Sequence, residues 1–424
     1  MGTCADCVPN EVIFQLVDPT NLGVVAAKYG LNATPLGQVG TPPTYRMAVD
    51  TAQTSQTPVQ IVAAMATDAR ITKAEVNRKL SAVERQGLPW TLGRSWAIGR
   101  SWAIGSSAKS FAKQWFPYSI HLDQAHGISK GAGVTVAVLD TGIDPNHPAF
   151  EGKLVPGFDF VDNDNDPSEV GTYYTNPVYG HGTHVAGIIA LTAPDAKIMP
   201  IRVLDESGVG DLWRVTAAII WAADNGAQIA NISFGYPDNP NLLEDIIDAC
   251  DDGVTIDGKT FPELGENRIM IVAAAGNGGD DTPIYPAGNR LDPMIGVGSG
   301  NRFERLSSFS TMSHDGSGNE RFIRLVAPGE GIISTIPGGR YATWSGSSMA
   351  APVAAGVAAL VKSHVPLITP PELVNRLEDT GIAWACTFGS PRNYAMDTSR
   401  VDALCALNNN LTCGTNPNAC QMSP

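Results

Sequence analysis

The feature that most constrains the fold is a series of short, continuous apolar runs in the last two thirds of the chain. The runs lie at 134–139, 198–204, 229–233, 269–275 and 294–297. Apolar runs of this length are typical of strands buried on both faces. Helical patterns separate them at 185–191, 212–225 and 353–364. Strands that alternate with helices predict an α/β fold, in which a parallel sheet forms the middle of three layers.

The polar residues that follow these runs indicate where a site would lie. In open parallel sheets, ligands bind beyond the carboxyl ends of the strands. Asp140 closes the first run and Asn277 follows the fourth. We therefore expect both side chains at the same edge of the sheet.

Three motifs place an acid, a histidine and a serine in turn-rich contexts. They are LDTGID with Asp140, GHGTHVAG with His181 and GSSMAAP with Ser348. A serine nucleophile needs a histidine that takes its proton and a carboxylate that orients the imidazole. Each motif alone also has a plain structural interpretation, namely a turn Asp, a histidine pair and an N-capping serine. His184 is interpreted as structural, because the glutamate of a metalloprotease HExxH helix is missing.

The order Asp, His, Ser is the one that subtilisin uses, whereas chymotrypsin uses His, Asp, Ser. The chain resembles the subtilase family over residues 113–408, and the three motifs match its signature blocks. One departure is Ser347, where the family usually has threonine. The resemblance implies a serine endopeptidase acting through an acyl-enzyme. Ser348 would be the nucleophile, His181 the general base and acid, and Asp140 the residue that orients His181.

The resemblance also implies the oxyanion donor and the substrate cleft. Asn277 would donate a side-chain N–H to the tetrahedral intermediate. Two strand edges would hold an extended peptide by β-augmentation, and Ile284 would form the floor of the P1 pocket. A branched floor residue predicts a small P1 side chain. The expected substrate-binding residues are Ser233, Phe234, Gly235, Gly210, Ala274, Ala275, Gly276 and Ile284.

Residues 8–82 are predicted to form a small α+β unit. Strand patterns at 12–17 and 45–49 alternate with a helical stretch at 22–29 and a helix that Thr57 and Pro58 open. This unit resembles the pro-domain of fervidolysin-like subtilases, which implies a folding template and intramolecular inhibitor and hence an autoprocessed zymogen. Residues 83–112 are expected to be a linker with the maturation site, and 409–424 a tail with cysteines. The hexapeptide RSWAIG occurs twice in the linker, so cuts after Gly99 and Gly105 are predicted.

No cofactor is expected for catalysis, but a structural calcium ion is. Asp162, Asp164 and Asp166 alternate on a short loop that resembles a calcium loop of thermitase-like enzymes. The alternative is a solvated acidic turn. Cys4 and Cys7 form a CxxC, but a zinc ribbon would need a second pair nearby.

Charge and hydropathy limit the partners. The formal net charge is −14, which argues against nucleic acid and anionic membranes, because phosphate contacts need a basic face. No apolar stretch is long enough for a transmembrane helix, and no secretory signal is visible. We expect a monomeric, secreted protein whose signal has been removed, with an intracellular protein as the alternative. The C-terminal cysteines would be disulfides in the first case and thiols in the second.

Two other functions fit parts of the pattern. A subtilase fold kept as a non-catalytic scaffold would have a degenerate triad, and none of the motifs is degenerate. A serine esterase of the α/β-hydrolase type would need GxSxG, whereas Ser348 lies in GSSMA. Hydrolysis of proteins or peptides is therefore the predicted activity.

Overall fold

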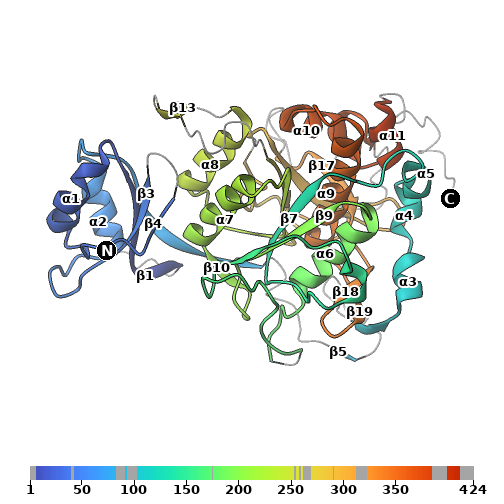
Figure 1. Ribbon diagram of the computed structural model, residues 1–424, viewed down its shortest axis with the longest axis horizontal. Helices are drawn as coiled ribbons and strands as arrows, with labels where there is room; N and C mark the ends of the chain where they lie inside the picture. Colours follow the sequence, from blue (N-terminus) through green and yellow to red (C-terminus); the bar gives the residue numbers. More distant parts are fainter. Residues whose placement is uncertain are drawn as a thin grey trace.

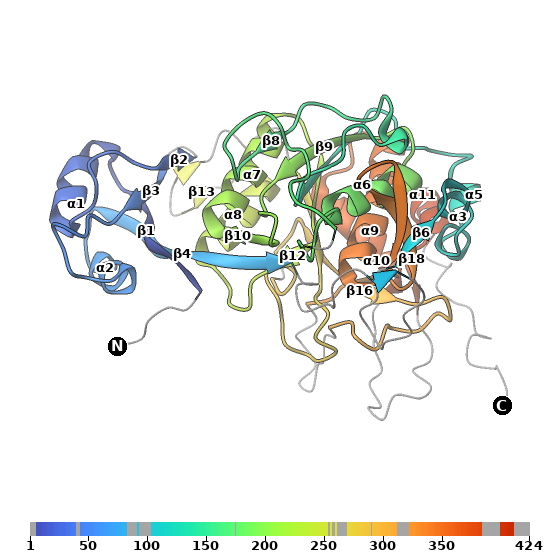
Figure 2. The ribbon, with the colours of Figure 1, turned by 90° about the horizontal axis from the view of Figure 1, so that it is seen from below.

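The computed structural model describes most of the chain. The described residues are 6–39, 43–82, 91–92, 103–173, 175–252, 255–256, 259–260, 269–289, 291–311, 322–383 and 399–410. They form a small N-terminal unit beside a larger α/β unit (Figures 1 and 2). Among them, no helix has both the length and the apolar character needed to cross a membrane.

The N-terminal unit is an antiparallel sheet covered by two helices. Strand β1 (Cys7–Leu16) pairs with β3 (Thr44–Ala48) on one side and with β4 (Ile71–Ala82) on the other, and β2 (Gly37–Val39) pairs with β3. Helices α1 (Leu22–Tyr29) and α2 (Pro58–Met65) lie together on one side of the sheet (Figure 1), and a 3₁₀ turn (Pro19–Asn21) precedes α1. Side chains from both helices and from β1 form a separate small core.

Local sequence signals explain why α2 begins where it does. The hydroxyl of Thr57 accepts the N–H of Gln60, and the Gln60 side chain accepts the N–H of Thr57, which is a complete capping box. Pro58 occupies the first turn, where its missing N–H costs nothing. The predicted helix start is confirmed.

The larger unit is built on a nine-stranded sheet. In spatial order its strands are β20 (Ile382–Ala383), β21 (Ser399–Arg400), β17 (Leu325–Pro328), β16 (Met294–Gly300), β15 (Met270–Ala274), β11 (Ile229–Ile232), β7 (Thr135–Asp140), β9 (Lys197–Arg202) and β8 (Phe158–Asp159). Every neighbouring pair is parallel except β20 with β21. The predicted α/β class with a parallel sheet is confirmed.

Helices cover both faces of this sheet. The longer ones are α6 (His181–Thr192), α7 (Leu212–Asp224), α8 (Asn241–Asp252), α9 (Ser347–His364) and α10 (Pro370–Asp379). The chain moves from β7 to β9 in one direction and from β9 to β11 in the other, so right-handed crossovers put α6 and α7 on opposite faces. Helix α6 packs with α9, and α7 packs with α8.

The remaining short elements lie around this frame. They are α3 (Ala108–Ala112), α4 (Phe116–Ser119), α5 (Leu122–Ala125), a 3₁₀ turn (Pro148–Phe150), β10 (Val209–Asp211), β12 (Phe234–Gly235), β13 (Thr255–Ile256), β14 (Lys259–Thr260) and α11 (Ala403–Asn408).

Part of the expected linker belongs to a sheet. Strand β6 (Ala103–Ser106) pairs with β19 (Arg340–Trp344) and with β5 (Thr91–Leu92), and β18 (Ile332–Ile336) completes four strands. Gly105 lies within β6, whereas Gly99 lies outside the described residues. The repeat did not predict this pairing, because β6 and β19 lie far apart in the sequence.

Strand β4 joins the two units. Its first part, up to Arg78, pairs with β1. Its last residues pair antiparallel with β10 on one side and with β12 on the other. Figure 2 shows β4 as one long strand that leaves the N-terminal unit and runs into the larger one.

Candidate active site

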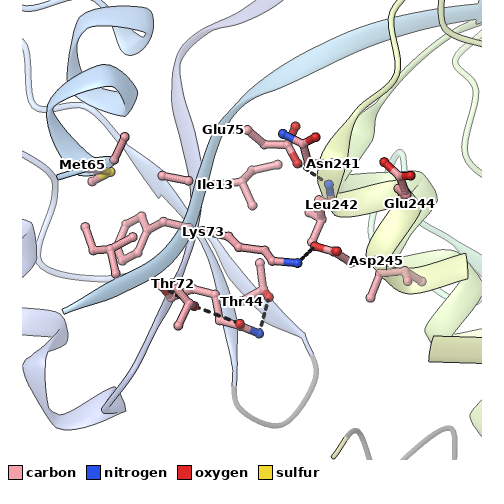
Figure 3. A pocket seen from close by; sticks show the side chains of 16 residues that line it. Ile13, Thr44, Met65, Thr72, Lys73, Glu75, Asn241, Leu242, Glu244 and Asp245 are labelled. Atoms are coloured by element: carbon pink, nitrogen blue, oxygen red, sulfur yellow. Dashed lines mark hydrogen bonds and ion pairs between the residues drawn. The ribbon is translucent and has the colours of Figure 1, made fainter. Parts of the chain in front are cut away.

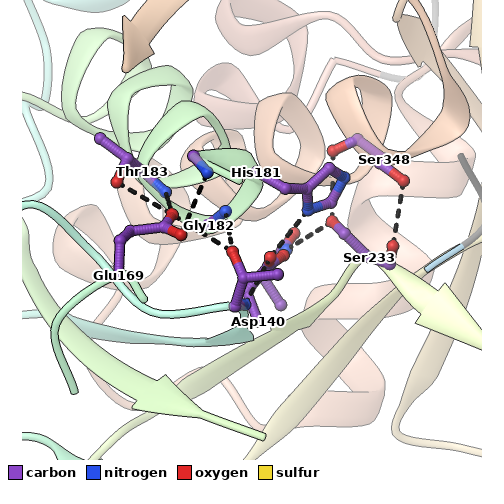
Figure 4. Close-up of polar contacts among 10 residues, drawn as sticks. Asp140, Glu169, His181, Gly182, Thr183, Ser233 and Ser348 are labelled. Atoms are coloured by element: carbon purple, nitrogen blue, oxygen red, sulfur yellow. Dashed lines mark hydrogen bonds and ion pairs between the residues drawn. The ribbon is translucent and has the colours of Figure 1, made fainter. Parts of the chain in front are cut away.

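The acid and the histidine of the first two motifs are in direct contact. Asp140 is the last residue of β7, and His181 is the first residue of α6. The Nδ1 atom of His181 lies 2.7 Å from Oδ1 of Asp140, and both side chains are fully buried. In Figure 4 the imidazole lies between Asp140 and Ser348, so the residues of all three motifs meet at the carboxyl edge of the sheet.

Ser348 lies in the first turn of α9. The N-cap residue of this helix is Gly346, which makes no side-chain capping hydrogen bond. The Ser348 hydroxyl donates to the carbonyl oxygen of Ser233 over 3.0 Å, and the Ser233 hydroxyl donates to the Ser348 carbonyl over 3.2 Å. Asn231 Nδ2 donates to Ser233 Oγ over 2.9 Å. The helix dipole leaves partial positive charge around Ser348, which suits a developing oxyanion.

Asn277 lies directly beside this helix start. Its Oδ1 accepts the N–H of Ser347 over 2.8 Å, which leaves the NH₂ group as the donating end of the side chain. The Ser347 hydroxyl accepts the N–H of Gly276 over 3.0 Å. The small hydroxyl that replaces the family's usual threonine therefore still fastens β15 to α9.

Close packing explains the glycine that follows the histidine. A Cβ on Gly182 would lie 2.1 Å from the carbonyl oxygen of Gly142 and 3.0 Å from Cβ of Asp140. Only glycine allows α6 to approach the end of β7 this closely. The 2.7 Å contact between His181 and Asp140 depends on that approach.

His184 has a structural environment. It is buried, and its ring stacks on Trp344 with centroids 4.5 Å apart and planes 5° apart. Burial lowers the pKa of His184 to about 3, so the ring is neutral at physiological pH. Its Nε2 atom bonds the carbonyl of Ala342 over 3.2 Å.

The two strand edges expected to bind substrate flank β4. Gly210 of β10 pairs with Leu80, and Gly235 of β12 pairs with Ser81. Phe234 pairs with Ala82 at the end of the strand. The predicted edges thus face each other across one extended strand, next to Ser348.

Ile284 packs against two of the glycines that were expected to bind substrate. A Cβ on Gly235 would lie 2.2 Å from its Cγ2 atom, and one on Gly276 would lie 2.7 Å from its Cδ1 atom. Ile284 therefore lies against both Gly235 and Gly276. Ala274, the last residue of β15, and Ala275 are both buried.

A model of the subtilase family matches residues 131–403. The chain belongs to the subtilase family. This subtilase is 38% identical over 262 residues to the thermophilic serine proteinase of Bacillus sp. (strain AK1), a match that covers 59% of this chain and 58% of that protein. It is 39% identical over 264 residues to thermitase of Thermoactinomyces vulgaris, covering 60% of this chain and 83% of thermitase.

The fold extends the comparison to the N-terminal unit. Fervidolysin from Fervidobacterium pennivorans, a keratinolytic enzyme related to subtilisin, superposes with a TM-score of 0.73 at 22% identity. The superposition covers 96% of the subtilase and 62% of the fervidolysin chain. The fervidolysin-like arrangement expected from the sequence is confirmed as a fold.

The N-terminal unit of the subtilase also contacts the starts of two helices. Oδ1 of Asn77 accepts the N–H of Trp213 in α7 over 3.2 Å, and Oε1 of Glu75 accepts the N–H of Leu242 in α8 over 2.7 Å. Lys73 forms an ion pair with Asp245 beside a cavity of about 460 Å³ between the units (Figure 3). Burial raises the pKa of Glu75 to about 7.

The expected calcium ligands make other contacts in the subtilase. Asp162 forms an ion pair of 2.5 Å with Arg202, and Oδ1 of Asp164 accepts the N–H of Asp166 over 2.9 Å. Among the described residues, no group of three or more His, Cys, Asp and Glu side chains is arranged to hold a metal ion. Calcium binding at this loop stays a prediction.

Glu169, near the triad, was not predicted from the sequence. Its carboxylate accepts hydrogen bonds from both sides of His181 and from the residue after Asp140 (Figure 4). No recognised motif contains it, because it lies in an irregular segment before the second block. Only the folded chain brings it to the site.

Proposed function

We propose that this subtilase is a serine endopeptidase that is made as an autoprocessed zymogen. The observation that carries the proposal is the His181–Asp140 contact beside Ser348, at the end of a cleft that holds an extended strand. A buried carboxylate on Nδ1 fixes the tautomer in which Nε2 can take a proton. A cleft that pairs with backbone on both sides selects peptides.

In this mechanism Ser348 attacks the scissile carbonyl while His181 takes its proton. Asp140 orients the imidazole and stabilises the imidazolium. The NH₂ group of Asn277 and the backbone N–H of Ser348 donate to the oxyanion. The Asn277 side chain needs no reorganisation for this, because the N–H of Ser347 already holds it in place. His181 then protonates the leaving amine, and water hydrolyses the acyl-enzyme by the reverse steps.

The N-terminal unit would act as an inhibitor and folding template until it is cut away. Support comes from β4, whose end lies between β10 and β12 and so competes with substrate for the same backbone groups. The caps that Asn77 and Glu75 supply to α7 and α8 fasten the unit outside the cleft. The proposed organisation is 8–82 pro-domain, 83–112 linker, 113–408 catalytic domain and 409–424 tail.

Ile284 supports a preference for small residues at P1. Its branched side chain touches both Gly235 and Gly276, so little volume remains between these walls. Packed sites do not yield such volume cheaply. We expect Ala, Gly or Val at P1, and slow cleavage after Phe or Tyr.

Secretion, a monomeric state and a structural calcium ion complete the proposal. Cys7 and Cys405 are both in disulfides, which persist in oxidising compartments and so support an extracytoplasmic protein. Calcium would bind at Asp162, Asp164 and Asp166. A chelator that leaves the melting temperature unchanged would rule that site out.

Comparison of wild type with Ser348→Ala on a casein-like substrate tests the activity. Wild type should cleave it at internal bonds, and Ser348→Ala should be inactive but folded, as judged by an unchanged circular dichroism spectrum. Equal activity of the two proteins would exclude Ser348 as the nucleophile.

A further inference from the structure

The first turn of α6 carries His181 but has no side chain of its own to cap it. The N-cap residue is Gly180, and the first intrahelical bond runs from His184 N–H to the Gly180 carbonyl. The N–H groups of Gly180, Gly182 and Thr183 therefore need acceptors from elsewhere in the chain.

Glu169 supplies most of these acceptors. Its Oε2 atom accepts from Gly180 N–H over 3.1 Å, and its Oε1 atom accepts from Thr183 N–H over 3.0 Å. The hydroxyls of Thr183 and Thr141 also donate to Oε1, over 3.1 and 3.2 Å. One carboxylate thus takes four hydrogen bonds.

The bonds of the two threonines have a fixed direction. Gly182 N–H donates to the Thr141 hydroxyl over 2.9 Å, and Asp144 N–H donates to the Thr183 hydroxyl over 2.9 Å. Each hydroxyl has one proton, and it goes to Glu169. Oε1 therefore accepts both hydroxyls, while Oε2 accepts the Gly180 N–H, so both oxygens are acceptors, which neither an amide nor a protonated acid can provide fully.

The network joins the chain neighbours of Asp140 and His181. Thr141 directly follows Asp140, while Gly180 and Gly182 flank His181. The backbone of Glu169 is itself tied to the first motif, since its N–H donates to the Ile143 carbonyl over 3.0 Å. Glu169 lies on none of the strands that line the substrate cleft.

We propose that Glu169 is a positioning residue for the catalytic histidine, holding the start of α6 against the end of β7 so that His181 stays aligned with Asp140. The inference rests on the proposed peptidase function. The carboxylate of Glu169 also adds negative charge near the imidazole. Burial raises the pKa of Glu169 to about 7, and the backbone hydrogen bonds from Thr183 and Gly180 oppose this rise.

The variant Glu169→Gln keeps the size and places an NH₂ group against a donor. We expect kcat per titrated active site to fall by about tenfold to 100-fold, since misplacement by about 1 Å costs roughly 100-fold. KM should stay within about twofold of wild type. The acid limb of kcat/KM should move to lower pH, because loss of a nearby anion lowers the pKa of an imidazolium.

Other charged and titratable groups around this carboxylate stay in place in the variant. They are Asp140, Asp144, Tyr173, Tyr179, His181 and Arg340. The shift of the acid limb is therefore read against the same background in both proteins.

Asp402→Asn is the matched control. Asp402 is a buried carboxylate before α11; its Oδ2 atom lies 2.6 Å from Nδ1 of His121, and its Oδ1 atom accepts the Cys405 N–H over 3.0 Å. Asn keeps the helix cap but loses the charge that pairs with His121, so the variant should lower the melting temperature and leave kcat and the acid limb unchanged. A Glu169→Gln protein that behaves in the same way would reduce Glu169 to a structural cap and overturn the proposal.

A second pair keeps the test decisive if Glu169→Gln does not fold. Thr141→Val removes the hydroxyl that links Glu169 to Gly182, and it should lose more kcat than Thr141→Ser, which keeps the hydroxyl. Equal kcat in the two variants would contradict the network. Inactive wild type would instead contradict the peptidase function, so the two failures are distinguishable.

Discussion

The backbone of Ser81 pairs in antiparallel register with the backbone of Gly235. On its other side, Ser81 pairs with Val209. A strand held on both edges in this way has the geometry of β-augmentation, in which main-chain hydrogen bonds supply much of the affinity. The end of β4 therefore occupies the position that an extended substrate would need.

Maturation is the first prediction from this register. Wild type should shorten by about 10 kDa, an order of magnitude set by the size of a small domain, while Ser348→Ala stays full length. Intact mass spectrometry of both proteins measures it. The register predicts a first cut in the residues that directly follow Ala82, upstream of the duplicated hexapeptide, with later trimming after Gly99 or Gly105. Fully active wild type of unchanged length would disprove the inhibitor role.

The P1 pocket gives the second prediction. Peptides that vary only at P1 should be cleaved faster after Ala or Val than after Phe, because Ile284 fills space between Gly235 and Gly276. Ile284→Gly should gain kcat/KM on the Phe peptide and keep its rate on the Ala peptide. Wild type that prefers Phe would show that another residue sets the pocket depth.

Asn277→Asp gives the third prediction. The substitution keeps the oxygen that accepts the Ser347 N–H and removes the donating NH₂ group. We expect kcat to fall by about 100-fold to 1,000-fold with little change in KM, a general figure that itself comes from a subtilisin. The melting temperature serves as the control. A loss of less than about threefold would mean that Asn277 does not touch the oxyanion.

The docking contact of Glu75 gives the fourth prediction, on pH. Burial raises the pKa of Glu75 to about 7, so the folded protein binds a proton there more tightly than the unfolded chain. This contribution to stability is present at acid pH and is lost as the pH rises through about 7. We therefore compare full-length Ser348→Ala with the same protein carrying Glu75→Gln. The change in melting temperature caused by Glu75→Gln should be more favourable at pH 8 than at pH 5.

A pH-independent effect of Glu75→Gln would contradict that account. Lys73, Arg78 and Asp245 also act on Glu75 and remain in the variant. The comparison within one background removes the contribution of the half-buried Glu169, whose pKa is also raised.

The sequence predicted the fold well where the signal was local or periodic. Continuous apolar runs such as the one at 136–139 are strands because burial on both faces demands apolar residues throughout. Helix starts were less predictable. Helix α6 begins at His181, about a turn before its apolar pattern, because its first turn is glycine-rich and its caps come from elsewhere in the chain.

The site was predictable as a set of motifs but not as a network. Asp140, His181 and Ser348 stand in recognisable blocks. Glu169 does not, since its role depends on the pairing of its segment with Ile143. The continuation of β4 past its own sheet was likewise invisible, because strand pairing between distant segments leaves no local pattern.

Labelling by a serine-directed phosphonate tests the central claim most directly. Processed wild type should take up one equivalent and lose its activity in step, and peptide mapping should place the label on Ser348. A His181→Ala protein should label far more slowly, since the hydroxyl is then not activated. Labelling at another serine, or activity that survives full labelling of Ser348, would contradict the account.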